Sequence, residues 1–327
     1  SLDEYEKEIP EFLEELSKFS AYIEDADDYV EFDVTIGISF EKQNSLEKAE
    51  IALKYAQKTR RNYIAYNRSI DTTKQLKDAR FWRSEIKKAI LENHIVPFFQ
   101  PIVDREQNIV KYEVLMRLER EKDGEIEFVS PFFFLNVAKQ TKQYEKLTQI
   151  MIERSFEIMK DLEVDFSLNL SFEDINNNLL IGTLKELIGK YKIGNRLIFE
   201  IVESEDIDNY EAVQLFVEEV KALGVRIAID DFGSGFSNYK RIFDIAPSFL
   251  KIDGSLIKNI DTDKNSYELV KSIASLTKAL DIKTVGEHVY SKDIFDICYE
   301  LGVDEFQGYY FSEPICEKAL LESLVPA

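Results

Sequence analysis

The feature of the sequence that most constrains the fold is a repeated alternation of strand and helix patterns from Val96 onward. Eight segments are typical of buried strands: VPFFQPIV, KYEVLMRL, DFSLNLS, RLIFEIVES, RIAIDDFG, FLKIDGS, KTVGEHV and EFQGYYF. Most neighbouring pairs flank an amphipathic helix pattern, such as YEAVQLFVEEVKALG. This alternation predicts an α/β fold with a parallel sheet, and eight units predict closure into a TIM-like (β/α)8 barrel.

The joint between the first two strands is too short for a crossover helix. Seven residues, DREQNIV, separate QPIV from KYEVL. Parallel neighbours need a connection of a dozen or more residues, whereas a few suffice for a hairpin. We therefore expect the first strand to run antiparallel to the second.

The first 67 residues read as a separate unit. EFLEELSKFSAYI predicts a helix, VEFDVTIGISF a strand, and SLEKAEIALKYAQKTRRNYIAYN a second helix. So short a piece has a thin core, so we expect a small α+β fragment, 1–67, that docks on the next domain or belongs to a larger one. The polar RSIDTTKQL predicts a linker over 68–76. LKDARFWRSEIKKAILENH predicts a helix leading into the barrel domain, 77–327.

The formal charge of −21 limits the partners of the chain. A long nucleic acid is held chiefly by Lys and Arg side chains that neutralise phosphates, so we expect no nucleic acid polymer as a partner. A small phosphorylated ligand is compatible with this charge if a metal ion and a few placed cations attract it locally.

The sequence has neither the apolar stretch of roughly 20 residues that a bilayer span needs nor a basic, apolar signal peptide at its start. We therefore expect a cytoplasmic chain, or the cytoplasmic part of a larger membrane-bound protein whose sensory region lies upstream. Cys298 and Cys316 lack a metal-type spacing and are expected to be ordinary thiols.

Polar residues fall at or near the carboxyl ends of the predicted strands, where barrels of this kind place their active sites. They are Glu113, Asn169, Glu200, Asp230, Asp231, Lys251, Glu287 and Gln307. Strand parity points Glu200 inward, whereas Glu203 points the other way unless the strand has ended, so Glu203 is expected to anchor a loop. One such residue is usually a cap, but packing gives no reason for acids and amides at most strand ends of one barrel.

Carboxylates gathered at one mouth repel one another unless cations are bound between them. Oxygen ligands without cysteine or clustered histidine favour Mg²⁺ or Mn²⁺ over zinc. Asp230 and Asp231 precede the flexible FGSGFS, which allows both to turn toward the mouth and one to bridge two ions. Two ions activate water and neutralise charge in phosphodiester cleavage, and Lys251 is placed to orient that water. The pattern predicts a metal-dependent phosphodiesterase.

The same residues resemble the motifs of EAL-domain cyclic di-GMP phosphodiesterases. FFQPIVDREQNIVKYEVLMR is similar to the opening of that family, with Glu113-Val114-Leu115 in place of Glu-Ala-Leu. NLS, FEIVES, DDFGSG, LKID and FQGYYFSEP come after it in the family's order. The resemblance covers about residues 77 to 327 and implies hydrolysis of 3′,5′-cyclic di-GMP to linear pGpG.

The resemblance also implies roles for single residues. The first metal ion would be held by Glu113, Asn169, Glu200 and Asp230, and the second would be associated with Asp230, Asp231 and Glu287. Lys251, with Asp231 and Glu287, would be catalytic through the nucleophilic water. The residues implied to contact the ligand are Gln100, Leu115, Arg117, Asp253 and Gln307. Glu203 would hold the DDFG loop, which in the family often lies at a homodimer interface.

The chain departs from the family pattern in one motif that matters. Where the family commonly has Ala-Glu-Gly-Val-Glu, this chain has Gly286-Glu287-His288-Val289-Tyr290. Tyr290 supplies no carboxylate, so weaker binding of the second ion or slower turnover is expected, and His288 replaces a flexible glycine. A second interpretation therefore stays open, in which the barrel is a catalytically weakened receptor that binds cyclic di-GMP. A third interpretation is a scaffold that only dimerises through the loop after Asp231.

Residues 1–67 resemble the last part of a GGDEF domain, through VTIGISF and LEKAEIALKYAQKTRRNYIAYN. The signature GGDEF loop is absent from the sequence, so no cyclase activity is expected of this remnant.

Overall fold

The computed structural model describes residues 9–15, 20–23, 28–31, 34–41, 43–59, 61–67, 73–202, 210–233 and 244–324. The chain divides into two units, residues 1–82 and 83–327. Within the described ranges, no helix combines the length and the apolar composition that a membrane span needs.

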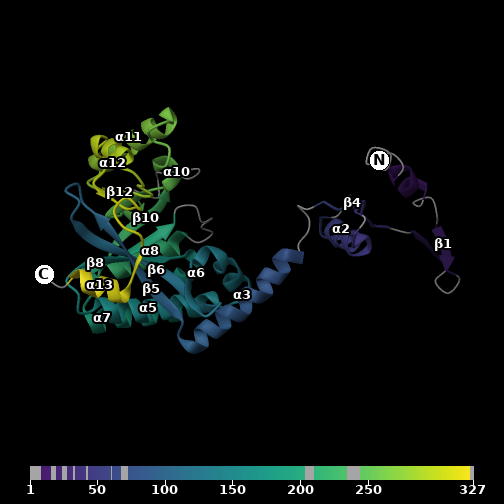
Figure 1. Ribbon diagram of the computed structural model, residues 1–327, viewed down its shortest axis with the longest axis horizontal. Coiled ribbons are helices and arrows are strands. Elements are labelled where there is room, and N and C mark those ends of the chain that lie inside the picture. The colour runs from purple at the N-terminus through teal and green to yellow at the C-terminus, as the bar shows by residue number, and fades with distance from the viewer. Residues whose placement is uncertain are drawn as a thin grey trace. The chain divides into compact units, whose positions relative to one another are not determined.

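The first unit contains a small β-α-β arrangement (Figure 1). Strand β3 (Ile36–Ile38) pairs in parallel with β4 (Tyr63–Ala65), and helix α2 (Ser45–Thr59) connects them. The helix lies so close to β3 that a Cβ on Gly37 would be 2.1 Å from the carbonyl oxygen of Ala49. Glycine at this position therefore permits the packing of α2 on the strand.

The structure corrects the sequence-based prediction for this unit in two places. The first expected helix is present over 9–15, but Ser20–Ile23 form β1, which pairs antiparallel with β2 (Asp28–Glu31). The second expected helix ends at Thr59, and Tyr63–Ala65 continue as β4. In both places the backbone hydrogen bonds to a neighbouring strand outweigh the local helical pattern, because tertiary pairing overrides propensity.

The second unit is a closed barrel, and all eight predicted strands take part in it. They are β5 (Ile95–Val103), β6 (Ile109–Lys122), β8 (Asp165–Leu170), β9 (Leu197–Val202), β10 (Arg226–Phe232), β11 (Phe249–Ile252), β12 (Lys283–Gly286) and β13 (Glu305–Phe306). From β6 through β8 to β13, neighbouring strands run parallel, and β5 closes the ring.

Strand β5 is antiparallel to both of its barrel neighbours, β6 and β13. The short DREQNIV joint predicted this direction relative to β6. Two further strands were not expected from the sequence. Strand β7 (Glu125–Val129) extends the β5–β6 hairpin through the far half of β6, and β14 (Ile315–Cys316) pairs with β5 beside β13.

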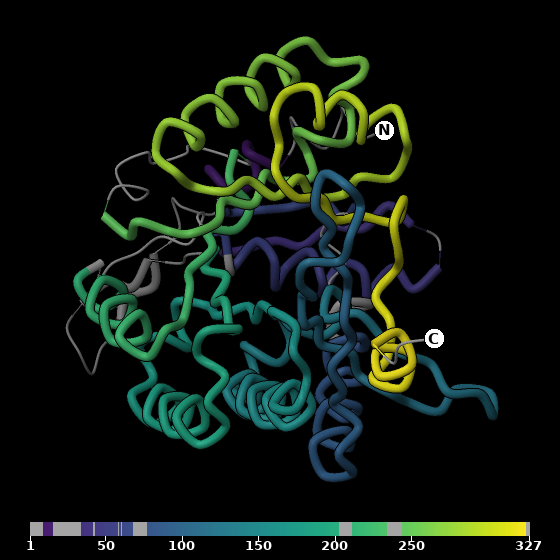
Figure 2. The backbone as a smooth tube through the Cα atoms, turned by 90° about the vertical axis from the view of Figure 1, so that its left-hand side faces the viewer, coloured from purple at the N-terminus to yellow at the C-terminus, as the bar shows by residue number. Residues whose placement is uncertain are grey.

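Helices surround the barrel. They are α3 (Thr73–Glu92), α4 (Leu135–Gln140), α5 (Tyr144–Met159), α6 (Phe172–Ile175), α7 (Asn178–Tyr191), α8 (Tyr210–Lys221), α10 (Gly254–Ile257), α11 (Lys264–Ala279), α12 (Lys292–Glu300) and α13 (Glu317–Leu324), with 3-10 turns at η2 (Pro131–Phe133) and η3 (Gly194–Arg196). Figure 1 shows α5 and α7 side by side, with α11 and α12 on the opposite side of the strands. Figure 2 shows α13, in yellow, beside the blue β5 and β6.

Helix α3 begins at Thr73, so the end of the predicted linker, 68–76, is helical. Residues 68–72 lie outside the described residues. Ile86 and Ala89 are buried and the helix leads directly into β5, as the sequence predicted.

The interior of the barrel is filled at the end opposite to the strand tips that were predicted to be functional. Ile102, Ile198, Ala228, Phe249 and Val285 form one apolar cluster there. Next to this cluster, the buried Lys111 forms an ion pair with Glu305. The ammonium of Lys111 lies 3.5 Å from the centre of the Phe249 ring. This end is packed, which leaves the carboxyl ends of the parallel strands as the open face.

Candidate active site

Most of the predicted polar residues meet in one cavity at the carboxyl ends of the strands, whereas Asn169 lines a neighbouring cavity and Glu200 is buried. The first of these cavities has a volume of about 580 Å³. The predicted residues that line it are Gln100, Glu113, Leu115, Arg117, Asp230, Asp231, Lys251, Glu287 and Gln307. Glu113, Glu200 and Lys251 are buried, so strand parity was right to point Glu200 inward.

Lys251 of β11 is the centre of the site. Its Nζ lies near one carboxylate oxygen from each of four elements: 3.4 Å from Glu113, 2.6 Å from Glu200, 3.0 Å from Asp230 and 2.8 Å from Glu287. The side chain is 2% exposed. The ammonium of Lys251 therefore neutralises part of the negative charge of these four carboxylates. Other cations or protons must neutralise the rest.

Two amide side chains donate hydrogen bonds to the carboxylate of Glu113. Asn169 Nδ2 donates to Glu113 Oε1 at 2.7 Å, and Gln307 Nε2 donates to Glu113 Oε2 at 2.7 Å and to Gln100 Oε1 at 3.1 Å. The strand register places Gln100 opposite Glu113 and puts Asn169 two residues beyond Ser167, the partner of Glu113 on β8. Facing side chains of paired strands are close enough to interact.

A local irregularity in β10 brings a second aspartate into the site. Regular alternation would turn Asp231 away from the face that carries Ala228 and Asp230. The pairing with β11 shifts between Ile229 and Phe232, and Asp231 has a left-handed φ of 56°. Carboxylate oxygens of Asp230, Asp231 and Glu287 consequently lie within 4.8 Å of one another. A backbone outlier of this kind is typical of functional sites.

The environment favours the charged forms of Lys251 and Glu113. Burial acts to lower the pKa of Lys251, but the surrounding carboxylates, Asp230 and Glu113 first, raise that pKa well above its ordinary value. Burial acts to raise the pKa of Glu113, but Lys251 and the amide donors of Gln307 and Asn169 outweigh it and lower the pKa. Both groups are ionised at neutral pH.

Three carboxyl groups of the site, those of Glu200, Asp231 and Glu287, bind protons more readily than usual. Burial and the charge of Glu113 raise the pKa of Glu200 to about 8, against the opposing effect of Lys251. Burial also raises the pKa of Glu287 well above its ordinary value. Burial and the charges of Asp230 and Asp253 raise the pKa of Asp231 to about 6. Repulsion between acids that share one site produces shifts of this direction.

The residues present fit divalent metal ions. Two buried acceptors, Asp230 Oδ1 and Gln307 Oε1, have no hydrogen bond among the described residues, although Lys251 Nζ lies 3.0 Å from the former. The donor set is all oxygen, which suits hard cations, and an ion would take the place of the extra protons. The cluster of Asp230, Asp231 and Glu287 is the set expected for a second ion, and Glu113, Asn169, Glu200 and Asp230 lie on four adjacent strands, as expected for a first.

Asp253 does not line the cavity. Its carboxylate accepts a hydrogen bond from the backbone N–H of Ser255 at 2.9 Å and caps α10, so the ligand contact expected of Asp253 stays a prediction. Glu203 lies outside the described residues, as does the loop over 234–243 that was expected at a dimer interface. Arg117 lines the cavity, with its guanidinium 5.6 Å from the centre of the Phe98 ring.

Sequence reasoning missed several residues that form the walls of the cavity. Ser130 and Pro131 come from the segment after β7, Lys258 ends α10, and Tyr309 follows the FQG motif. A neighbouring cavity of about 400 Å³ shares Leu115, Pro131, Asp230 and Asp231, and apolar residues such as Met116 and Met151 contribute to its walls. Strand-end position could not identify these residues, because they lie on connections or beyond the strand tips.

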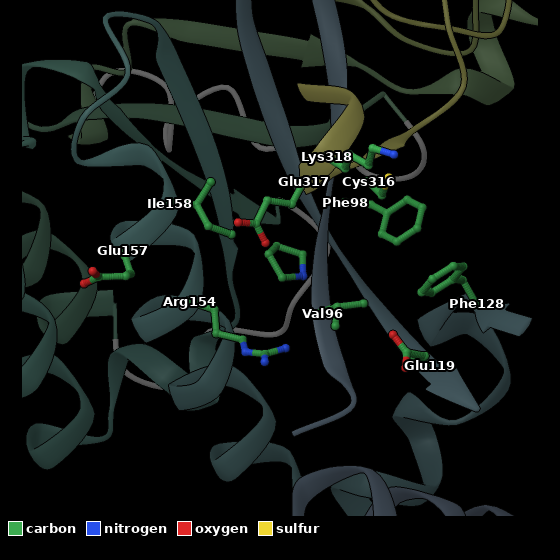
Figure 3. A pocket seen from close by; sticks show the side chains of 11 residues that line it. Val96, Phe98, Glu119, Phe128, Arg154, Glu157, Ile158, Cys316, Glu317 and Lys318 are labelled. Carbon is green, nitrogen blue, oxygen red and sulfur yellow. The ribbon is translucent and has the colours of Figure 1, made fainter. Parts of the chain in front are cut away.

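A separate hollow lies between β5, β7, α5 and α13 (Figure 3). The rings of Phe98 and Phe128 pack against each other there, tilted by 57° and with their centres 4.9 Å apart. Arg154 Nη1 donates to the backbone oxygen of Ile95 at 2.7 Å. The hollow shares no lining residue with the site cavity.

Comparisons with known proteins agree with this geometry. The model of the family described as EAL domain matches residues 83–314. The cyclic di-GMP phosphodiesterase PdeF of Escherichia coli is 31% identical over 247 residues, which are 74% of this chain and 32% of that protein. The cyclic di-GMP phosphodiesterase PdeB of Shewanella oneidensis is 28% identical over 297 residues, 86% of this chain and 34% of that protein. The chain thus spans about a third of the length of these curated relatives.

A solved structure shares the fold. The EAL enzyme Bd1971 in its cGMP-bound form superposes with a TM-score of 0.70 and 25% sequence identity. The superposition covers 79% of this chain and 73% of that chain. The expected barrel with an antiparallel first strand is therefore confirmed by both the topology and the structural likeness.

Proposed function

The chain belongs to the EAL domain family, and we propose that it hydrolyses one phosphodiester bond of cyclic di-GMP to give linear pGpG. The observation that carries this proposal is the arrangement of four carboxylates around Lys251, next to the cluster of Asp230, Asp231 and Glu287. Relatives named cyclic di-GMP phosphodiesterases support the choice of substrate.

Glu113, Asn169, Glu200 and Asp230 would hold one Mg²⁺ or Mn²⁺ ion, and Asp230, Asp231 and Glu287 would hold a second. When bound, such ions lower the pKa of a coordinated water and neutralise charge on the oxygens that enter and leave phosphorus. The carboxylates contribute by giving up the protons that burial and mutual repulsion lead them to bind.

Lys251 supplies a positive charge among the four carboxylates of the site. Its ammonium lies within 3.0 Å of Glu200, Asp230 and Glu287, so it can orient a water molecule held between these carboxylates. In the proposed reaction the water oxygen forms a bond to phosphorus, the bond from phosphorus to one ribose O3′ breaks, and that oxygen leaves with a proton. A preorganised cation stabilises the charge that develops on the phosphoryl oxygens.

Gln100, Leu115, Arg117 and Gln307 would position the substrate from the side of β5, β6 and β13. Arg117 projects beyond Glu113 on the same face of β6, which places a guanidinium where a phosphate that is not being cleaved could bind. Asp253 would act at the edge of the site. The neighbouring cavity would take part of the second nucleotide, because it adjoins Asp230 and Asp231.

We also propose roles for the first unit and for the loop after Asp231. The β-α-β arrangement of β3, α2 and β4 is consistent with the last part of a GGDEF domain, without the signature loop. Glu203 would anchor the loop after Asp231, and a homodimer would form through that loop. A sensory region in the longer protein would then control the barrel.

A receptor that binds cyclic di-GMP without cleaving it is the second candidate. The observation that favours it is Tyr290, which stands where the family commonly has a second glutamate and lines the cavity. Tight binding of cyclic di-GMP with no product after long incubation would identify a receptor.

The test of the proposed function is a product assay on the full chain. Chromatography with authentic pGpG as a standard should show conversion of cyclic di-GMP in the presence of Mn²⁺ or Mg²⁺, and none with a chelator. Binding of Mn²⁺ and cyclic di-GMP without conversion would exclude the enzyme and favour the receptor.

A further inference from the structure

The loop that carries Glu287 is held by the strands on both of its sides. Glu287 N donates to Ile252 O at 3.3 Å, and Val289 N donates to Gln307 O at 3.0 Å. Tyr310 N donates to Val289 O at 3.1 Å. These bonds continue the parallel pairing of β12 for a few residues beyond its end, so the loop is an extension of the barrel and its side chains have defined positions.

The side chain of Tyr290 adds one more hydrogen bond to this loop. Its hydroxyl donates to the backbone oxygen of Lys258 at 3.1 Å, while 55% of the residue remains exposed. Lys258 ends the short helix α10, which directly follows the strand of Lys251. The hydrogen bond therefore connects the segment that carries Glu287 with the segment that follows Lys251, across the face of the site.

The same two segments meet a second time at His288. His288 adopts a left-handed φ of 54°, and its imidazole lies so close to Gly254 that a Cβ there would be 2.4 Å from Nδ1. A residue other than glycine is strained in this conformation. Backbone hydrogen bonds of Glu287 and Val289 flank His288, and the bond of the Tyr290 hydroxyl lies two residues further on, so these contacts together hold the strained residue.

We propose that Tyr290 is a positioning residue, which fixes the loop so that Glu287 stays beside Asp230 and Asp231 as a metal-ligand cluster of three carboxylates. On this view the chain keeps its second ion through the rigidity of the loop, with one carboxylate fewer than the family commonly supplies. The inference rests on the proposed function only where it assigns the bound ions to the hydrolysis of cyclic di-GMP. The predicted effect itself is on the binding of the metal.

The test removes one hydroxyl and measures metal binding without nucleotide. Tyr290→Phe keeps the ring and loses the hydrogen bond. Calorimetric titration of the full chain with Mn²⁺ should show the weaker of two binding events weakened roughly fivefold, the factor that corresponds to about 1 kcal/mol for one hydrogen bond. If wild-type protein turns over cyclic di-GMP, the variant should need a similarly higher Mn²⁺ concentration for half-maximal rate.

Tyr191→Phe is the matched control. The Tyr191 hydroxyl donates to Glu157 Oε2 at 2.6 Å, between α7 and α5, so this variant loses a comparable hydrogen bond elsewhere. Its Mn²⁺ titration should match that of the wild type. Equal titrations for Tyr290→Phe and wild type, or equal losses in both variants, would overturn the inference. Absence of Mn²⁺ binding in the wild type would instead refute the proposed metal site, which keeps the two failures distinct.

Discussion

The Nζ of Lys251 lies 2.6 Å from Oε2 of Glu200, and both side chains are almost completely buried. The two residues come from β11 and β9, on either side of the strand that carries Asp230 and Asp231. A cation is therefore built into the carboxylate site itself, and the site can be folded before any ion binds. Much of the chemistry proposed for this chain depends on that relationship.

Lys251→Met should destabilise the metal-free protein and make it dependent on metal. Removing the cation leaves Glu113, Glu200, Asp230 and Glu287 without their shared counter-charge, and breaking a buried ion pair costs roughly 3 to 5 kcal/mol. In thermal unfolding, Mn²⁺ should recover more stability in this variant than in the wild type. Turnover should fall by at least about a hundredfold even with saturating Mn²⁺.

Lys111→Met provides the comparison for that experiment. Lys111 also forms a buried ion pair, with Glu305, but at the packed end of the barrel. Its loss should lower the melting temperature without any added response to Mn²⁺. Identical responses of the two variants to Mn²⁺ would contradict a special role for Lys251.

Stability of the metal-free protein should fall as pH rises from 5 to 8. The pKa of Glu200 is raised to about 8 from an ordinary value of 4.5, so between these values the folded protein holds a proton that the unfolded chain has released. The free energy of unfolding therefore decreases with pH in this window, by up to about 1.4 kcal/mol per pH unit for one proton. Asp231 and Glu287, whose pKa values are also raised, contribute with the same sign.

Urea unfolding at several pH values with a chelator present measures this slope. Glu200→Gln should flatten it, because the variant has no group to titrate at that position. The lowered pKa of Glu113 and the raised pKa of Lys251 act outside the window, below and above it respectively. Burial lowers the pKa of His288, which acts inside the window with the opposite sign in both wild type and variant. A slope that is the same in wild type and variant would show that Glu200 is ionised throughout.

Binding of Mn²⁺ near pH 7 should release protons. Metal ligands must be deprotonated, and Glu200 and Glu287 have raised pKa values in the metal-free protein. Calorimetric titrations in two buffers with different ionisation enthalpies give the number of protons released. We expect at least about one proton at pH 7 and fewer above pH 9. Heats that do not depend on the buffer would contradict the protonated resting state.

Gly308→Ala should disrupt the loop of Glu287. A Cβ on Gly308 would lie 2.0 Å from the backbone oxygen of Val289, and backbone atoms cannot move aside cheaply. The expected loss is on the order of 2 kcal/mol or more in urea unfolding, with a loss of Mn²⁺ binding. Gly182→Ala is the control: this glycine lies inside α7 with nothing within 4 Å of the added Cβ, so a gain of about 0.5 to 1 kcal/mol is expected.

Much of the barrel could be predicted because its signals are local. The length of DREQNIV determined the direction of β5, and strand parity separated Glu200 from its neighbours. The clustering of polar residues at strand ends then followed from the topology of a parallel barrel, in which those ends meet at one face.

Other features depend on contacts that the linear sequence does not encode locally. Ser20–Ile23 resemble a helix until β2 is present to pair with them. The turn of Asp231 into the site depends on a shift in pairing with β11. The hydrogen bond of the Tyr290 hydroxyl is accepted by a backbone oxygen 32 residues away. Every residue type carries such an oxygen, so the sequence does not show which residue accepts the bond.

In the proposed reaction, carboxylates at the strand ends hold ions that make water reactive toward a phosphodiester. Formation of pGpG from cyclic di-GMP with Mn²⁺, compared between wild type and Glu113→Ala, tests it most directly. Glu113 accepts hydrogen bonds from Asn169 and Gln307 and contacts Lys251, so its loss should reduce the rate at least about a thousandfold while the melting temperature shows that the barrel remains folded. Product formation by the variant at the wild-type rate, or by the wild type at an undiminished rate with excess chelator, would contradict the account.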